Sequence, residues 1–267
     1  MYKRQGVGGG ITCDMTGFIA STFLRGVNFV LVPTTLLSQV DASIGGKTGV
    51  NHKGFKNMIG TFNQPVQVII DTKFLKSLSK LEIQCGLMEV IKHGLISDKS
   101  FFVWIEKNLK QILSLKPQFI ERAIKRSIEI KADVVSKDEK ENGLRAILNF
   151  GHTFGHALET IGNNKLYTHG EAVALGMLAA TKLSESISDL DPKVFDRVHS
   201  TIKNTGIKLK LKKKIFPKKL IKLMQSDKKK NNSQLKFILL EKIGKAKIKS
   251  VSNEVTIENA IKNSLFY

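Results

Sequence analysis

The hydrophobic periodicity of this 267-residue chain changes near residue 80, and this change is what most constrains its fold. Before it, short β-branched runs at Val27–Val32 and Val66–Ile70 alternate with glycine-rich turns and one helical segment, Met15–Arg25, a pattern typical of α/β architecture. After it, apolar residues recur every three or four positions, which indicates helices. We therefore expect part of an α/β domain over residues 1–80 and a mostly helical domain over residues 81–267.

The helical part divides into segments that the apolar spacing marks. These are Leu81–Leu95, Lys99–Leu113, Pro117–Asp138, Gly170–Ile187, Pro192–Thr205 and Lys218–Gln225, followed by one strand, Leu235–Leu240, and a turn at Gly244. Residues 41–57 are polar and rich in turn formers, so we expect a loop there. The glycine-rich turn at residues 6–10 has no predicted strand before it, and its spacing does not match the dinucleotide-binding fingerprint.

A net charge of +20 first suggests nucleic acid as a partner. However, only six of the 43 basic residues are arginines, and residues 201–267 hold 18 lysines against four acids. Arginine is the usual choice for clamping phosphates and reading bases, so we interpret the lysines as a solvated surface and expect no nucleic-acid partner. The sequence has no apolar run of membrane-spanning length and only two cysteines, and we expect a cytoplasmic protein with no membrane partner.

The densest polar cluster surrounds His152 and His156, which lie one helical turn apart if this segment is a helix. That is the spacing of two metal ligands, but Thr153 stands where a zinc protease needs glutamate. Glu89, in an apolar helical segment, is a further candidate because a buried carboxylate needs a partner. Spacing alone leaves His93, His156 and His169 open as the third ligand, and a plain polar helix face remains the alternative.

The segment Gly45-Gly46-Lys47-Thr48 resembles the end of a phosphate-binding P-loop. Asp41 occupies the place of the first P-loop glycine, so the segment is not that motif. Two glycines and a lysine can still present backbone N–H groups and a cation to an oxyanion. A plain loop with a solvated lysine fits this segment equally well.

Taken together, these segments resemble the 3-dehydroquinate synthases, a family of sugar-phosphate cyclases. The resemblance covers nearly the whole chain. Its motifs are Pro33–Leu37, Val40–Asn51, Lys56-Asn57, Glu89–Lys92, Gly143–Arg145, Leu148–Thr153 with His156, and His169–Val173.

The resemblance implies a partial Rossmann-like NAD-binding domain followed by a helical metal-binding domain, in a homodimer. The expected reaction is a carbon–oxygen lyase reaction that converts 3-deoxy-D-arabino-heptulosonate 7-phosphate to 3-dehydroquinate and phosphate. NAD would oxidise a hydroxyl transiently and then be regenerated.

The resemblance also implies roles for individual residues. The expected ligands of one zinc or cobalt ion are Glu89, His152 and His169. The resemblance therefore assigns His156 to phosphate binding and proton transfer instead of to the metal. Lys47, Asn57 and Asn149 would bind the phosphate, with Arg25 joining them from the neighbouring subunit. The substrate carboxylate would meet Lys131, Arg145 and Lys228 or Lys229, the ring hydroxyls would meet Asp41 and Lys92, and Glu141 would accept a proton. The expected NAD contacts are Gly9, Gly10, Ile11, Asp14, Thr34, Thr35, Lys47, Lys56, Phe74, Leu75, Lys76 and Ser77.

Two features depart from the family pattern. The sequence begins at the family's glycine-rich turn, so we expect a truncated chain that folds poorly and binds NAD weakly, and whose own activity stays open. Cys13 stands where the family usually has glycine, which predicts some crowding of the cofactor turn.

Two other enzyme classes stay open. A related cyclase with a valiolone or inosose product needs fewer partners for a carboxylate, and a metal-dependent NAD alcohol dehydrogenase of the glycerol type would produce net NADH.

Overall fold

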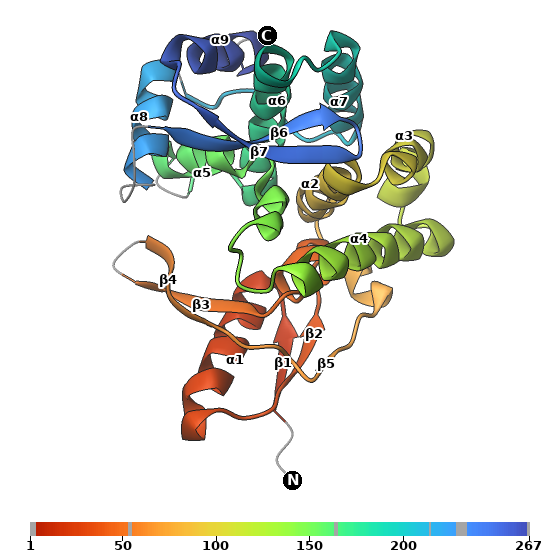
Figure 1. Cartoon of the computed structure of the whole chain (residues 1–267). Coiled ribbons are helices and arrows are strands. Elements are labelled where there is room, and N and C mark those ends of the chain that lie inside the picture. The colour runs from red at the N-terminus through yellow and green to blue at the C-terminus, as the bar shows by residue number, and fades with distance from the viewer. Residues whose placement is uncertain (1–3, 53–54, 163–164, 214, 228–233, 266–267) are drawn as a thin grey trace. The chain divides into compact units, whose positions relative to one another are not determined.

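The computed structural model describes residues 4–52, 55–162, 165–213, 215–227 and 234–265 (Figure 1). Its internal contacts divide it into two compact units. Unit 1 comprises Met1–Val90 and Lys110–Arg145, and unit 2 comprises Ile91–Leu109 and Ala146–Tyr267. The division falls within helix α2 (Lys80–Ser97), whose first residue coincides with the change in periodicity. The domain limits drawn from the sequence stay a prediction.

Unit 1 is built on a three-stranded parallel sheet in the order β1-β2-β5, formed by β1 (Gln5–Gly8), β2 (Val30–Pro33) and β5 (Gln67–Val68). Helix α1 (Gly10–Thr22) follows β1 directly and continues into a short 3₁₀ turn, η1 (Phe23–Arg25). The expectation that no strand precedes the glycine turn is wrong. Residues 5–8 form a strand because they pair with β2, a partner about 25 residues away that the local sequence does not reveal.

The prediction of a loop over residues 41–57 is also wrong for most of this segment. A π-type turn, η2 (Ser38–Ala42), leads to an antiparallel hairpin of β3 (Lys47–His52) and β4 (Phe55–Phe62). Gly49 faces Gly60 across the hairpin, and a side chain at Gly60 would overlap the carbonyl oxygen of Thr48. Gly49, one of the glycines that suggested a loop, thus serves the close pairing of two strands. A 3₁₀ segment, η3 (Thr72–Ser77), precedes α2.

The remaining elements are mainly helical. They are α3 (Lys99–Leu113), α4 (Pro117–Lys137), η4 (Leu144–Asn149), α5 (His152–Ile161), α6 (His169–Ser188), α7 (Pro192–Asn204), α8 (Pro217–Asp227), the hairpin of β6 (Leu235–Lys242) and β7 (Lys245–Val251), and α9 (Glu254–Leu265). The predicted helices and the strand at Leu235–Leu240 are confirmed, whereas β7 and α9 were not predicted. Within the described residues, no helix is long and apolar enough to cross a membrane.

Helix α6 is the centre of unit 2. Nearly all of its residues from Gly170 to Ser184 are buried, and α5, α7, α9 and β6 pack around it. The approach of α5 is especially close: a side chain at Gly176 would overlap the backbone carbonyl of Gly151, and one at Gly155 would lie 3.1 Å from the carbonyl oxygen of Ala172. Backbone meets backbone here, so neither helix can yield by a side-chain rotation. This contact fixes the start of α5 against α6.

We therefore expect Gly176→Ala to destabilise the protein by about 3 kcal/mol, the upper end of the range for overpacked sites, because the obstructing atoms are backbone. The free energy of unfolding from chemical denaturation checks this. Gly143→Ala is the matched control: a Cβ there meets nothing within 4 Å, and we expect a change within about 0.5 kcal/mol. A loss below about 1 kcal/mol in Gly176→Ala would contradict the packing described.

Candidate active site

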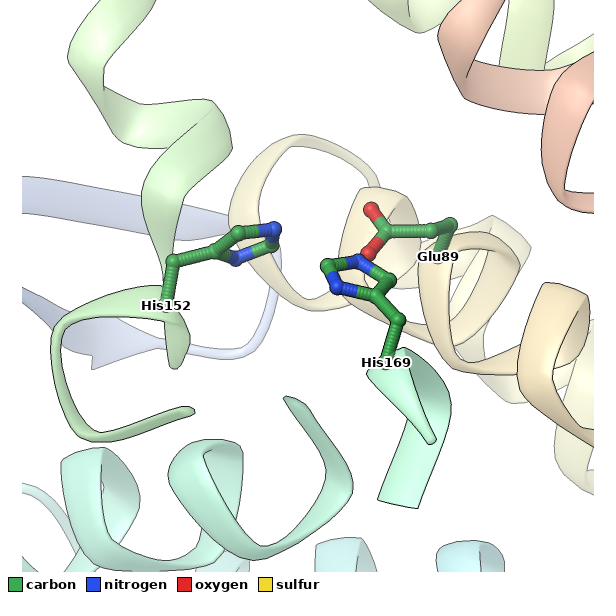
Figure 2. A group of neighbouring side chains, drawn as sticks. All are labelled: Glu89, His152 and His169. Atoms are coloured by element: carbon green, nitrogen blue, oxygen red, sulfur yellow. The ribbon is translucent and has the colours of Figure 1, made fainter. Parts of the chain in front are cut away.

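Glu89, His152 and His169 form a group of side chains of the types that ligate metals. One donor atom from each lies within 4.8 Å of the other two, and the two rings point toward the Glu89 carboxylate (Figure 2). Glu89 is completely buried, and both histidines are partly buried. One carboxylate and two imidazoles with room for further ligands suit zinc or cobalt in a catalytic site. The residues present therefore fit a divalent metal.

A second group of three donor atoms within 4.8 Å comes from Asp41, Glu89 and His93. The Asp41 carboxylate already accepts a hydrogen bond of 2.6 Å from the ammonium of Lys131. A carboxylate neutralised in this way is a weaker metal ligand than a second imidazole. The group with two histidines is thus the better metal site, and it contains neither His93 nor His156.

Each of the two histidines is the first residue of a helix, and the local structure before the helix fixes its position. His152 is the first residue of α5, after Gly151 in a left-handed conformation (φ 81°), and its Nδ1 lies 3.2 Å from the carbonyl oxygen of Phe150. His169 is the first residue of α6, after a Thr168 cap that exchanges hydrogen bonds with Glu171. The rings of His152 and His169 lie 5.4 Å apart between centroids, as do those of His152 and His156.

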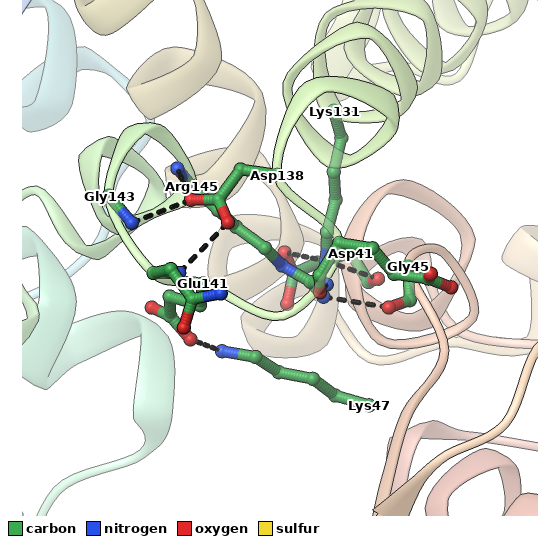
Figure 3. A network of polar contacts seen from close by, with 10 residues as sticks. Asp41, Gly45, Lys47, Lys131, Asp138, Glu141, Gly143 and Arg145 are labelled. Carbon is green, nitrogen blue, oxygen red and sulfur yellow. Dashed lines mark hydrogen bonds and ion pairs between the residues drawn. The ribbon is translucent and has the colours of Figure 1, made fainter.

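A cluster of cations and carboxylates occupies unit 1 (Figure 3). The ammonium of the buried Lys131, on α4, donates to both the carboxylate and the backbone carbonyl of Asp41, each at 2.6 Å. The exposed Lys47 forms an ion pair with Glu141, which has a left-handed backbone (φ 59°). A non-glycine residue in this conformation costs energy, and such strain gathers at functional sites.

Arg145 is held from several sides although it is almost fully buried. Its guanidinium donates to the carbonyl oxygens of Gly45, at 2.8 Å, and Glu139. A side chain at Gly45, which has φ 101°, would lie 2.7 Å from the guanidinium, so glycine gives the arginine its place. Burial lowers the pKa of Arg145, while neighbouring carboxylates, first among them Glu141, raise it.

Asp138 organises the loop that carries Glu141 and Arg145, a role that the sequence analysis missed. Its carboxylate accepts hydrogen bonds from the backbone N–H groups of Asn142, Gly143 and Arg145 at 2.8–2.9 Å. These bonds lower the pKa of Asp138, with the bond from Arg145 as the largest cause. Its position directly after a helix and before Asn-Gly is a sequence signal for such a loop.

Several expected NAD contacts lie together at the carboxyl ends of β1 and β2. Gly9 caps α1 and Gly10 is its first residue, while Thr34 and Thr35 follow β2. A Cβ on Gly9 would lie 3.3 Å from the Thr35 methyl group, so the two segments are adjacent. A helix N-terminus at this edge of a parallel sheet is suited to a pyrophosphate.

Cys13 is buried against this turn, and its Sγ donates a hydrogen bond to the carbonyl oxygen of Gly8. It is 2% exposed and packs with Ala20, Phe29 and Leu31. Burial raises its pKa to about 11, so the thiol stays protonated.

The other expected site residues are placed as follows. Among the expected substrate contacts, Lys92 is buried on α2 and Asn149 is the last residue of η4, whereas three others are exposed: Asn57 on β4, His156 on α5 and Arg25 at the end of η1. Among the expected NAD contacts, Ile11 and Asp14 lie on α1, and Phe74, Leu75, Lys76 and Ser77 lie in η3. Lys56 lies on β4, but its side chain is outside the described part of the structure, and Lys228 and Lys229 are outside the described residues altogether.

Family models and curated relatives agree on one family. Residues 4–85 match the family model of the 3-dehydroquinate synthase N-terminal domain, and residues 86–230 match that of its C-terminal domain. The 3-dehydroquinate synthase of Nitrosomonas europaea is 48% identical over 240 residues, which are 90% of this chain and 65% of that protein. The chain thus spans just under two thirds of the length of this curated relative.

Solved structures of two cyclases share the fold. The 2-epi-5-epi-valiolone synthase of Streptomyces hygroscopicus, with NAD+ and Zn2+ bound, is 26% identical with a TM-score of 0.89, over 98% of this chain and 74% of that one. A 2-deoxy-scyllo-inosose synthase with carbaglucose-6-phosphate, NAD+ and Co2+ is 27% identical with a TM-score of 0.88, over the same shares.

Asp14 provides a test of the electrostatics of this region. Burial, and then the charge of Asp41, raise its pKa from 3.8 to about 6, against a hydrogen bond from Asn57 and the charge of Lys131. Because the folded pKa is raised, the folded state loses stability as pH rises from 3.8 to about 6, and this penalty is complete above about 6 and absent below 3.8. Asp14→Asn removes that penalty.

We therefore expect Asp14→Asn to stabilise the protein at pH 7.5 by about 1–2 kcal/mol, after allowance for the partial exposure of Asp14. The advantage should vanish near pH 4. Urea unfolding of both proteins at the two pH values measures this. Equal stability at pH 7.5 would show that Asp14 titrates normally, and an advantage that persists at pH 4 would show that the gain does not come from the charge of Asp14.

Proposed function

Because the chain belongs to the 3-dehydroquinate synthase family, we propose that it acts on 3-deoxy-D-arabino-heptulosonate 7-phosphate and releases 3-dehydroquinate and phosphate. The observation that carries this proposal is the Glu89, His152 and His169 group, since the solved cyclases of the same fold bind Zn2+ or Co2+ together with NAD+. The proposed cofactors are therefore NAD and one zinc or cobalt ion.

A metal held by Glu89, His152 and His169 would polarise the substrate hydroxyl that is oxidised. In this proposal NAD is bound by the start of α1, by η3 and by four side chains: Thr34, Thr35, Lys47 and Lys56. A helix N-terminus and neighbouring glycines allow close approach to the pyrophosphate. When bound, NAD would supply a temporary acceptor for the hydride of the carbon that bears this hydroxyl, so that phosphate can leave and the reaction consumes no NAD overall.

The buried cations of unit 1 would bind the substrate carboxylate. Arg145 offers a planar fork suited to a carboxylate, and Lys131 adds a second charge held in place by Asp41. Lys228 or Lys229 would complete this set, and Lys92 with Asp41 would contact ring hydroxyls.

The phosphate would be bound by Lys47, Asn57, Asn149 and His156, with His156 also in proton transfer. The ion pair between Lys47 and Glu141 suggests how binding and chemistry are linked. A substrate phosphate competes for Lys47, which leaves the Glu141 carboxylate to accept a proton.

Arg25 would reach the phosphate from the partner subunit of a homodimer, in line with its exposed position at the end of η1. We also propose a cytoplasmic location, because both cysteines are free and buried.

We expect a version of this chain extended to the full length of its relatives, supplied with zinc and millimolar NAD, to release inorganic phosphate from the heptulosonate phosphate with no net NADH. Phosphate assay and absorbance of NADH measure the two quantities, and a chelator should abolish release until zinc or cobalt is restored. Absence of phosphate release under these conditions would contradict the proposal. Net NADH from a simple polyol would instead support the alcohol dehydrogenase alternative.

The solved neighbours act in valiolone and inosose synthesis, so the carboxylate partners separate the proposal from a related cyclase. We expect Lys131→Met to raise KM for the heptulosonate phosphate about 10–100-fold with a smaller change in kcat, since a charge-assisted hydrogen bond contributes about 1.5–3 kcal/mol. Lys137→Met, on the same helix and paired with Asp133 on the surface, is the control. An unchanged KM in Lys131→Met would rule out carboxylate binding by this side chain.

A further inference from the structure

We infer that Glu159 is a positioning residue that holds the ring of His169 so that this histidine offers Nε2 to a divalent metal. The inference rests on the metal centre of the proposed function and adds to it a residue that does not touch the metal.

Glu159 lies close to the right atom of His169. One of its carboxylate oxygens is 3.5 Å from Nδ1 of His169, and the Glu159 side chain is only 6% exposed. A carboxylate at this distance favours a hydrogen on Nδ1, and a neutral imidazole with its hydrogen there has its lone pair on Nε2. The nitrogen that remains available for a metal is therefore Nε2.

His152 is oriented by the same principle. Its Nδ1 lies 3.2 Å from the carbonyl oxygen of Phe150, an acceptor that also favours a hydrogen on Nδ1. Both histidines of the group thus have an acceptor at Nδ1, one a backbone carbonyl and the other a carboxylate. Metal-ligating histidines commonly have such a partner at the second nitrogen, which fixes the tautomer and strengthens the ligand.

The helix contact described above keeps Glu159 in reach of His169. Glu159 follows His152 by seven residues on α5, two helical turns, so both side chains lie on the same face of the helix. His169 begins α6, and the close approach at Gly151 and Gly176 holds the two helices together. Glu159 therefore faces His169 because of the packing of unit 2, and no local sequence pattern links the two.

A buried ion pair with a protonated His169 is the competing explanation of the same distance. The two explanations differ in what happens to metal affinity. A positioning carboxylate strengthens metal binding, whereas an ion pair with protonated His169 opposes it, because the proton must leave before the metal binds.

The test is the zinc affinity of the whole chain, measured by competition with a chromophoric chelator, a readout independent of catalysis. We expect Glu159→Gln to weaken zinc binding about 10–100-fold. Glu159→Asp keeps the charge and should recover part of the affinity. Glu185→Gln, at a carboxylate of α6 paired with Lys182, is the matched control and should bind zinc like the unchanged chain.

A second measurement reports the tautomer directly. In the metal-free protein labelled with ¹⁵N-histidine, we expect His169 to carry its hydrogen on Nδ1, and Glu159→Gln to reduce that preference. A folded Glu159→Gln variant with unchanged or tighter zinc binding would overturn the inference and leave the metal centre intact. Failure of the unchanged chain to bind zinc would instead overturn the metal centre, and the inference with it.

Discussion

The backbone contact between α5 and α6 is the constraint on which the candidate metal site depends. Gly176 lies against the carbonyl of Gly151, the residue before His152, and no larger residue fits there. This contact sets where α5 begins relative to α6, and each helix has a histidine as its first residue. Since a histidine side chain reaches only a short distance from its backbone, the backbone geometry decides whether the two imidazoles can share one ion.

The start of α6 is secured independently. Thr168 and Glu171 cap it reciprocally, and Lys212 pairs with Glu171 at 2.7 Å. Burial raises the pKa of Glu171, but the hydrogen bonds from Lys212 and Thr168 outweigh it, and the pKa is lowered overall. The carboxylate therefore stays charged and keeps the cap. His169 stands between this cap and the buried body of α6, which leaves its backbone little freedom.

The buried cations of unit 1 are held in place by hydrogen bonds to neighbouring oxygen atoms. Lys131 and Arg145 are buried and bonded to backbone carbonyls and to Asp41, so their charges are fixed in place. Most of the net positive charge lies instead in the last quarter of the chain, where 18 lysines stand against four acids. Some of these lysines form surface pairs, such as Lys245 and Lys247 with Glu241. The few cations with fixed positions, and not the net charge of the chain, are the groups suited to binding small anions.

By itself the sequence determined the helices, whose apolar periodicity reflects burial along each segment, and it supplied the donor types for a metal site. It did not reveal β1 or the β3–β4 hairpin, because strands depend on partners elsewhere in the chain, and glycines that pair closely look like loop formers. Residue spacing left His93, His156 and His169 equally open beside His152, and only the family resemblance favoured one of them. Only the tertiary structure groups His169 with Glu89 and His152 and brings Glu159 to its ring, because distances between helices are set by packing and not by separation along the chain.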